Sequence, residues 1–283
     1  MSKNTIKTFA LLAGFGALIM VIGSFFGEMG LLIGFGIALA FVGGSYWFSD
    51  KLAVKAAGAH EISEAEAPQL YATVRELAQR GDIPMPKVYL SPAPQPNAFA
   101  TGRNPEHAVV AVTAGLLQVL DPDEVRGVLA HEMSHVKNRD ILIGSVAAAM
   151  AMGITFIARM AMWGAMFGGG GGDRNNNVFG MLAMAILAPI AAVMIQMGIS
   201  RSREYEADRA GAALLGGDGE ALARALLKIE AAAKQAPMNI DPAQATAYII
   251  NPLTGRKANF AGLFSTHPPT EERVARLRSG ATQ

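Results

Sequence analysis

The chain has 283 residues, of which 51% are hydrophobic and 17% charged, and its mean hydropathy of +0.28 favours a membrane protein over a soluble domain. The formal net charge is +1, without an acidic or basic tail, so nothing in the composition supports a nucleic-acid or other polyanion partner. There is no cysteine, which excludes disulfide bonds, thiolate metal ligands and a cysteine nucleophile, so that His, Asp or Glu must hold any metal.

Two apolar runs begin the chain. Residues 9–26 contain no charge, and a second run at 29–48 follows Glu28. Each run is long enough to cross a hydrocarbon core, which needs about 20 helical residues. Lys3 and Lys7 precede the first run as they would in a signal peptide, but a second apolar run follows in place of a cleavage site. The two runs therefore predict a retained hairpin of membrane helices.

A polar segment with mixed secondary structure comes next. Apolar residues three and four positions apart predict a helix at 65–80, which Gly81 and Pro84 then end. Short strands are predicted at 87–90 and 108–112. The apolar face of the predicted helix consists of Leu70, Val74 and Leu77. These elements predict the first half of a small α+β domain.

A motif of metal ligands follows on a second predicted helix. Asp121 can cap this helix, and Glu124 stands where a capping box places its acid. On it, His131, Glu132 and His135 form the pattern His-Glu-x-x-His. Because residues four apart share a helical face, both imidazoles can bind one zinc ion while Glu132 stands beside them. The alternative is a chance match on an ordinary helix, and a third ligand decides between the two.

Two more apolar runs, at 141–167 and 178–199, predict a second membrane hairpin. The first of them carries Arg159, which could snorkel to the far interface. A buried helix of a soluble domain is the alternative for that run. The loops on one side contain Glu28, Asp173 and Arg174. The basic residues flanking the four runs all lie on the other side, and they are Lys3, Lys7, Lys51, Lys55, Lys137, Arg139, Arg201 and Arg203. The positive-inside rule therefore puts both termini and the polar segments in the cytoplasm.

The third metal ligand has to come from beyond this second hairpin. A metzincin is excluded because Asn138 and Ile141 stand where its extended pattern needs Gly and His. A thermolysin-like acid about 20 residues further on is also missing, since that stretch is apolar. After the fourth run, Glu204 and Asp208 share a helical face, whereas Glu206 points elsewhere. Glu204 is thus the predicted third ligand, and Asp208 is predicted to accept the free ring N–H of a ligating histidine.

These motifs resemble the HtpX family of membrane metalloproteases, which is related to the CAAX prenyl proteases. The resemblance covers essentially the whole chain and includes the segments 96–102 and 266–273. It implies a zinc-dependent endopeptidase that cleaves misfolded or damaged membrane proteins in quality control, as part of a stress response. The implied location is the plasma membrane, which is the inner membrane of a bacterium, with several spans and a cytoplasmic active site.

The resemblance also implies roles for residues outside the zinc motif. Asn97, Ala98 and Phe99 would line the substrate cleft as an edge strand. His267 and Arg273 would contact the scissile carbonyl or stabilise its oxyanion. From the residues alone, His267 is a turn residue before a helix, and that alternative stays open.

The predicted fold is a mainly α membrane protein with four transmembrane helices and a small α+β cytoplasmic zinc-protease domain. Its parts are the first membrane hairpin at 1–50, the two halves of the catalytic domain at 51–140 and 200–283, and the second hairpin at 141–199. One Zn²⁺ per chain is predicted, with Glu132 as general base, polypeptide substrates and a lipid bilayer as partners.

Two other functions can be built from the same residues. A non-catalytic membrane chaperone or scaffold with a structural zinc would use the same helices, but structural sites usually have four ligands and favour cysteine. A transporter with an intramembrane metal site is disfavoured because the motif residues lie outside the apolar runs.

Overall fold

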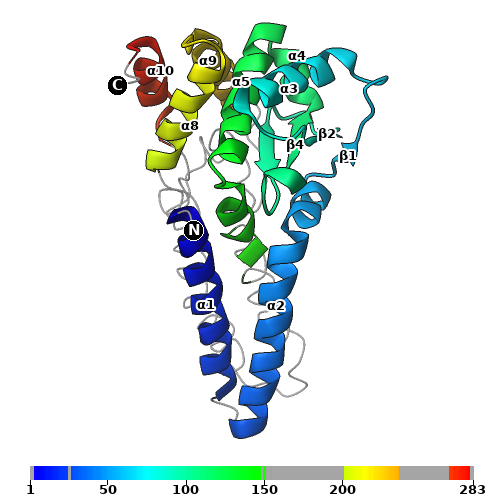
Figure 1. Cartoon of the computed structure of the whole chain (residues 1–283), viewed down its shortest axis with the longest axis vertical. Helices are drawn as coiled ribbons and strands as arrows, with labels where there is room; N and C mark the ends of the chain where they lie inside the picture. Colours follow the sequence, from blue (N-terminus) through cyan, green and yellow to red (C-terminus); the bar gives the residue numbers. More distant parts are fainter. Residues whose placement is uncertain are drawn as a thin grey trace.

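The computed structural model describes residues 3–24, 27–147, 149–150, 154, 201–235 and 268–280. It places two long helices at one end and a domain of helices and strands at the other (Figure 1). Apart from the first residues of the run at 141–167, the predicted second membrane hairpin lies outside the described residues, and so does His267.

The two long helices are α1 (Lys3–Ser24) and α2 (Gly27–Ala56), which lie side by side as the predicted N-terminal hairpin (Figure 1). Glycine allows them to approach closely, because a Cβ added at Gly23 would lie 2.5 Å from Gly30 O. Among the described helices, α2 alone is long and apolar enough to cross a membrane, and the apolar stretch of α1, Ile6–Val21, is shorter.

The outer surface of this hairpin is apolar. Leu32 is 65% exposed and Phe9 is 52% exposed, and most of the large apolar side chains that the described residues expose lie on α1 and α2. A contiguous apolar surface of this kind is unusual in water and is typical of a membrane or partner contact. The hairpin surface therefore suits a lipid environment.

The start of the predicted third span packs against α1. Residues 141–147 are helical, and Val146 and Met150 are buried together with Leu11 and Phe15. The chain that leaves the polar domain thus returns to the N-terminal hairpin, and the two parts share a packed apolar contact.

A four-stranded sheet lies in the polar domain, with the strands β1 (His60–Glu61), β2 (Lys87–Ser91), β3 (Ala98–Thr101) and β4 (Val109–Thr113). The strand order is β1-β2-β4-β3; β2 and β4 are parallel, and the other two pairs are antiparallel. A short 3-10 turn, η1 (Pro105–His107), connects β3 to the buried strand β4. The strands predicted at 87–90 and 108–112 are confirmed, the second displaced by one residue. β3 lies at an edge of the sheet.

Six helices complete the described part of the domain: α3 (Pro68–Gly81), α4 (Ala114–Val119), α5 (Pro122–Lys137), α8 (Arg201–Leu214), α9 (Glu220–Gln235) and α10 (Thr270–Arg278). In Figure 1, α5 lies between α3, α4 and the sheet on one side and α8 to α10 on the other. Leu77, Val110, Leu129 and Leu226 are fully buried in the core that joins them.

The boundaries of α3 differ from the prediction of 65–80 by a few residues at its start. Ser63 N donates to Glu66 Oε2 at 2.6 Å, which closes a turn just before the helix, and Pro68 then occupies its first turn. Asp82, in the left-handed conformation, ends the helix after Gly81. The predicted apolar face is confirmed, since Leu70, Val74 and Leu77 are buried.

The predicted capping box at the start of α5 is confirmed. Glu124 N donates to Asp121 Oδ1 at 3.0 Å, and Asp121 N donates to Glu124 Oε2 at 3.0 Å. Lys228 of α9 also donates to Glu124 at 2.6 Å. The helix that carries the metal motif thus begins at a defined residue and is joined there to α9.

Gly127 allows α5 and α9 to cross at short distance. A Cβ at this position would lie 2.7 Å from Leu222 N and 2.9 Å from Ala221 C, and backbone atoms cannot move aside cheaply. We expect Gly127→Ala to destabilise the fold by about 1–3 kcal/mol because the two helices must separate. Thermal unfolding in detergent measures this loss. Gly144→Ala is the matched control, since a Cβ there meets nothing within 4 Å, and an equal effect of both changes would contradict the interpretation.

Candidate metal centre

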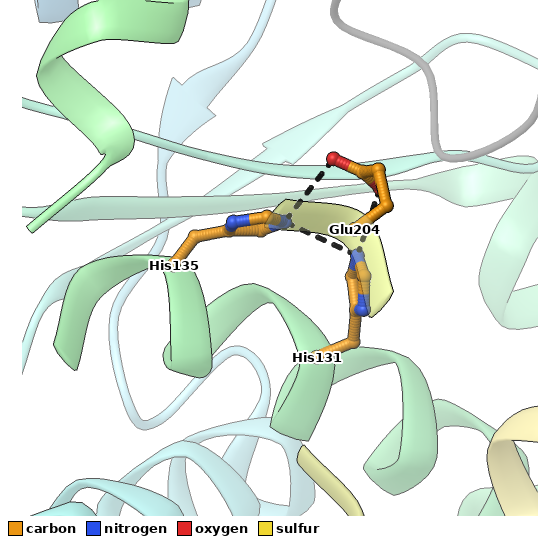
Figure 2. A group of neighbouring side chains, drawn as sticks. All are labelled: His131, His135 and Glu204. Atoms are coloured by element: carbon orange, nitrogen blue, oxygen red, sulfur yellow. Dashed lines mark hydrogen bonds and ion pairs between the residues drawn. The ribbon is translucent and has the colours of Figure 1, made fainter. Parts of the chain in front are cut away.

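Three side chains from two distant segments meet between α5 and α8. His131 and His135 lie one turn apart on α5, and Glu204 lies in the first turn of α8. Their potential ligand atoms all lie within 4.8 Å of one another. Figure 2 shows the two imidazoles and the carboxylate directed toward a common point. The structure therefore brings together the three residues that the sequence predicts as ligands.

The spacing of these atoms suits a zinc ion. The two Nε2 atoms are 3.2 Å apart, and the carboxylate oxygens of Glu204 lie 3.6 Å from His131 Nε2 and 3.8 Å from His135 Nε2. Tetrahedral bonds of about 2.1 Å separate ligand atoms by about 3.4 Å, close to the distance between the two nitrogens, while the two distances to Glu204 are to its different oxygens, Oε2 and Oε1. Two nitrogens and one oxygen, without sulfur, are also the donor types of catalytic zinc sites that keep an open position.

A carboxylate orients His131 from behind. His131 Nδ1 lies 2.9 Å from Asp208 Oδ1, so this ring nitrogen can donate and leave Nε2 for the metal. Asp208 is one helical turn after Glu204, as predicted from their shared face. Burial by itself raises the pKa of Asp208, but the Arg273 guanidinium and His131 outweigh it and hold the pKa well below its usual range. Asp208 is therefore ionised at neutral pH.

A second carboxylate, Asp140, contacts His135. Its oxygens lie 3.1 and 3.2 Å from His135 Nδ1. Burial by itself lowers the pKa of His135, but Asp140, followed by Glu204 and Glu132, raises it to about 10. The cluster thus attracts positive charge strongly, and a metal cation can take the place of the proton. Asp140 is not among the residues predicted from the sequence. Its position five residues after His135 was the available signal.

Glu132 lies beside the three ligands and contacts the sheet. Its Oε2 accepts a hydrogen bond from Ala100 N of the edge strand β3 at 2.8 Å. The side chain is almost fully buried, and burial raises its pKa against the lowering influence of the two histidines. A carboxylate with a raised pKa in this position can accept and release a proton close to the metal ligands.

The residues assigned to the substrate cleft lie at the start of this same strand. Asn97 precedes β3, and Ala98 and Phe99 are its first residues. All three are buried. Asn97 is held by β4, since Asn97 N donates to Thr113 Oγ1 and Thr113 N donates to Asn97 O, both at 2.9 Å. The edge position is confirmed, and the contact with substrate stays a prediction.

Arg273, on α10, lies close to Asp208 and His131. Its Nε and Nη2 donate to the two oxygens of Asp208 at 2.9 and 2.7 Å, and the side chain is 1% exposed. Nη2 also lies 3.4 Å from His131 Nδ1. The structure thus gives Arg273 an ion-pair partner that the sequence did not indicate. Its predicted contact with the scissile carbonyl stays a prediction, as does the role of His267. Glu206 is exposed on α8, as expected for a residue outside the site.

Comparison with known proteins bears on the chain as a whole. The sequence profile of Peptidase family M48 matches residues 64–281. A protein named "Protease HtpX homolog" from Syntrophobacter fumaroxidans is 54% identical over 279 residues, which cover 96% of this chain and 98% of the relative. A protein of the same name from Desulforapulum autotrophicum is 51% identical over 286 residues, which cover 98% of this chain and 90% of the relative.

The fold is also similar to a solved structure. The crystal structure of S. mikatae Ste24p superposes with a TM-score of 0.51 at 19% sequence identity. The match covers 96% of this chain but 65% of Ste24p, so this chain spans less than two thirds of that longer protein. At this level of identity the likeness concerns the fold alone.

Proposed function

The chain belongs to peptidase family M48 and is a zinc metalloprotease, and we propose that it hydrolyses membrane proteins, chiefly misfolded or damaged ones, at the cytoplasmic face of the membrane. His131, His135 and Glu204 would hold the zinc ion, and Glu132 would be the general base. The observation that carries this proposal is the convergence of three ligand atoms within 4.8 Å of one another, with the Glu132 carboxylate beside them.

Bound zinc supplies Lewis acidity that polarises a carbonyl group and lowers the pKa of water toward about 7. The chain's own residues supply the proton transfers. Glu132 takes a proton from the attacking water and passes it to the departing amine, a role that suits its raised pKa. The hydrogen bond from Ala100 N fixes one oxygen of Glu132, so that the other is available for this transfer.

The choice of substrate class is supported by how the site is connected to the membrane helices. α5 leads directly into the run that starts at Ile141, whose first residues pack against α1 of the apolar hairpin. α8 begins at Arg201, directly after the predicted fourth span. Both segments that carry metal ligands are thus anchored close to the bilayer surface, where unfolded parts of membrane proteins are within reach.

Removal of the metal is the first test. With full-length protein in detergent or lipid nanodiscs, a chelator should abolish cleavage of a model membrane protein, and added Zn²⁺ should restore it. Glu204→Ala should remove both zinc and activity, because only two of the three proposed protein ligands would remain. The matched control is Glu206→Ala, since Glu206 is exposed on the same helix, and we expect it to keep both. Equal zinc content and cleavage in the two variants would contradict the proposed ligand set.

A non-catalytic scaffold with the same metal ligands makes a different prediction. It would not require an acidic residue beside the site, and replacing Glu132 would leave its function intact. Glu132 is buried in contact with β3, its Oε2 lying 2.8 Å from Ala100 N. Burying a carboxylate costs free energy, which a scaffold would have no reason to spend, so this contact favours the enzyme over the scaffold.

A further inference from the structure

The end of α5 turns the chain back toward the metal ligands. Arg139 has a φ of 55°, in the left-handed region that residues other than glycine rarely adopt. Around it, Arg139 N donates to Val136 O at 3.1 Å and Asp140 N donates to His135 O at 3.2 Å. This backbone turn places the side chain of Asp140 against the helical turn that carries His135.

The side chain of Asp140 is committed to His135. Both of its oxygens lie within 3.2 Å of His135 Nδ1, and the side chain is 4% exposed. The other ordinary use of an Asp at this point would be to cap the helix that begins at Ile141. In the described part of the chain, Asp140 contributes only its backbone carbonyl to that helix, at 3.5 Å from Gly144 N. The carboxylate therefore acts on the histidine and not on the helix start.

The two histidines are supported in the same way. His131 Nδ1 faces Asp208, which pairs with Arg273. His135 Nδ1 faces Asp140, which interacts electrostatically with the half-buried Arg203. In both cases a buried carboxylate receives the ring N–H. A hydrogen bond of this kind selects the tautomer with a free Nε2 and makes that nitrogen a stronger ligand.

We propose that Asp140 is a positioning residue that orients His135 as a zinc ligand, an inference that rests on the metal centre proposed above. Asp140 also begins the segment that enters the predicted third span, whose residue Ser145 bonds Thr101 of β3 through their hydroxyls at 2.7 Å. The start of this segment thus contacts both His135, a proposed zinc ligand, and the edge strand. The geometry of the site is tied through it to the membrane hairpin.

Two substitutions separate this role from a structural one. Asn at position 140 still accepts the ring N–H but carries no charge, and Ser is too short to reach the ring, while both can cap a helix as well as Asp can. In full-length protein that carries Glu132→Gln, so that proteolysis does not interfere, zinc affinity is measured by competition with a chromogenic chelator. We expect a loss of about 10-fold for Asp140→Asn and of about 10–100-fold for Asp140→Ser. The visible spectrum of the Co²⁺-loaded protein should shift in both variants.

Asp218→Ser is the matched control, because Asp218 accepts a backbone hydrogen bond at the start of α9 at 2.8 Å and is exposed. It should leave zinc affinity and the Co²⁺ spectrum unchanged. Thermal unfolding of the metal-free variants shows whether each is folded. Wild-type zinc affinity in folded Asp140→Asn and Asp140→Ser would overturn the role of Asp140 alone, whereas failure of the parent protein to bind zinc would overturn the metal centre itself.

Discussion

Replacing Glu132 by glutamine is expected to slow peptide hydrolysis by orders of magnitude while leaving zinc bound. Glutamine has nearly the same shape, and its carbonyl oxygen can still accept the hydrogen bond from Ala100 N, which is 2.8 Å from Glu132 Oε2. It cannot take a proton from water. We expect the rate of cleavage to fall by about 10²–10⁴-fold, the usual contribution of a general base.

The measurement compares zinc content and the initial rate of cleavage of a model membrane protein for the wild type and Glu132→Gln. Zinc content is the internal control, because Glu132 is not a ligand in the proposed site. A fall in zinc content together with activity would mean that Glu132 binds the metal or stabilises the fold. A fully active Gln variant that contains zinc would remove Glu132 from the mechanism.

Loss of Arg273 is expected to have the largest effect on stability. Arg273 and Asp208 form a bidentate pair at 2.7 and 2.9 Å in which both side chains are almost fully buried. Arg273→Met leaves the carboxylate buried without its cation, which costs about 3–5 kcal/mol. Because the pair holds the pKa of Asp208 below its usual range, its stabilisation is present at neutral pH and is lost only as acid protonates Asp208.

Thermal unfolding of the metal-free protein checks this expectation. Arg276→Met on the same helix is the control, since Arg276 is 52% exposed in its pair with Glu272 and such surface pairs contribute about 0–1 kcal/mol. Asp208→Asn combined with Arg273→Met should destabilise less than the sum of the two single changes. An Arg273→Met protein with normal stability and no activity would instead place Arg273 at the substrate.

The metal motif was predictable because its geometry is local. The capping box at Asp121 and Glu124 starts α5, and helical periodicity then puts His131 and His135 on one face. Glu204 was also predictable from the sequence, since the apolar run that follows His135 has no acid at the thermolysin-like position and Asp208 shares the helical face of Glu204. The strands at 87–90 and 108–112 were predictable because they are short apolar runs. The start of α3 was predicted a few residues too early, because the turn formed by Ser63 and Glu66 delays the helix.

The supporting contacts were less visible in the sequence. Asp140 approaches His135 because Arg139 has a left-handed backbone conformation. Arginine does not favour this conformation, so the turn could not be predicted from the residue type. The contact between Glu132 and Ala100 links residues 32 positions apart in the chain. Gly127 has no special φ, and its importance comes from the backbone of α9 that crosses it.

The sequence by itself thus predicted the apolar hairpin, the helix that carries the His-Glu-x-x-His motif and the three candidate ligands that the structure brings together, because composition, capping and helical spacing act over a few residues. Tertiary structure alone decided which further groups support the two histidines: Arg273, which pairs with the predicted Asp208 next to His131, and Asp140, which contacts His135. These pairings depend on how α5, α8 and α10 pack together. That packing depends on many apolar contacts between residues that are far apart in the chain, and such contacts cannot be predicted from local sequence patterns.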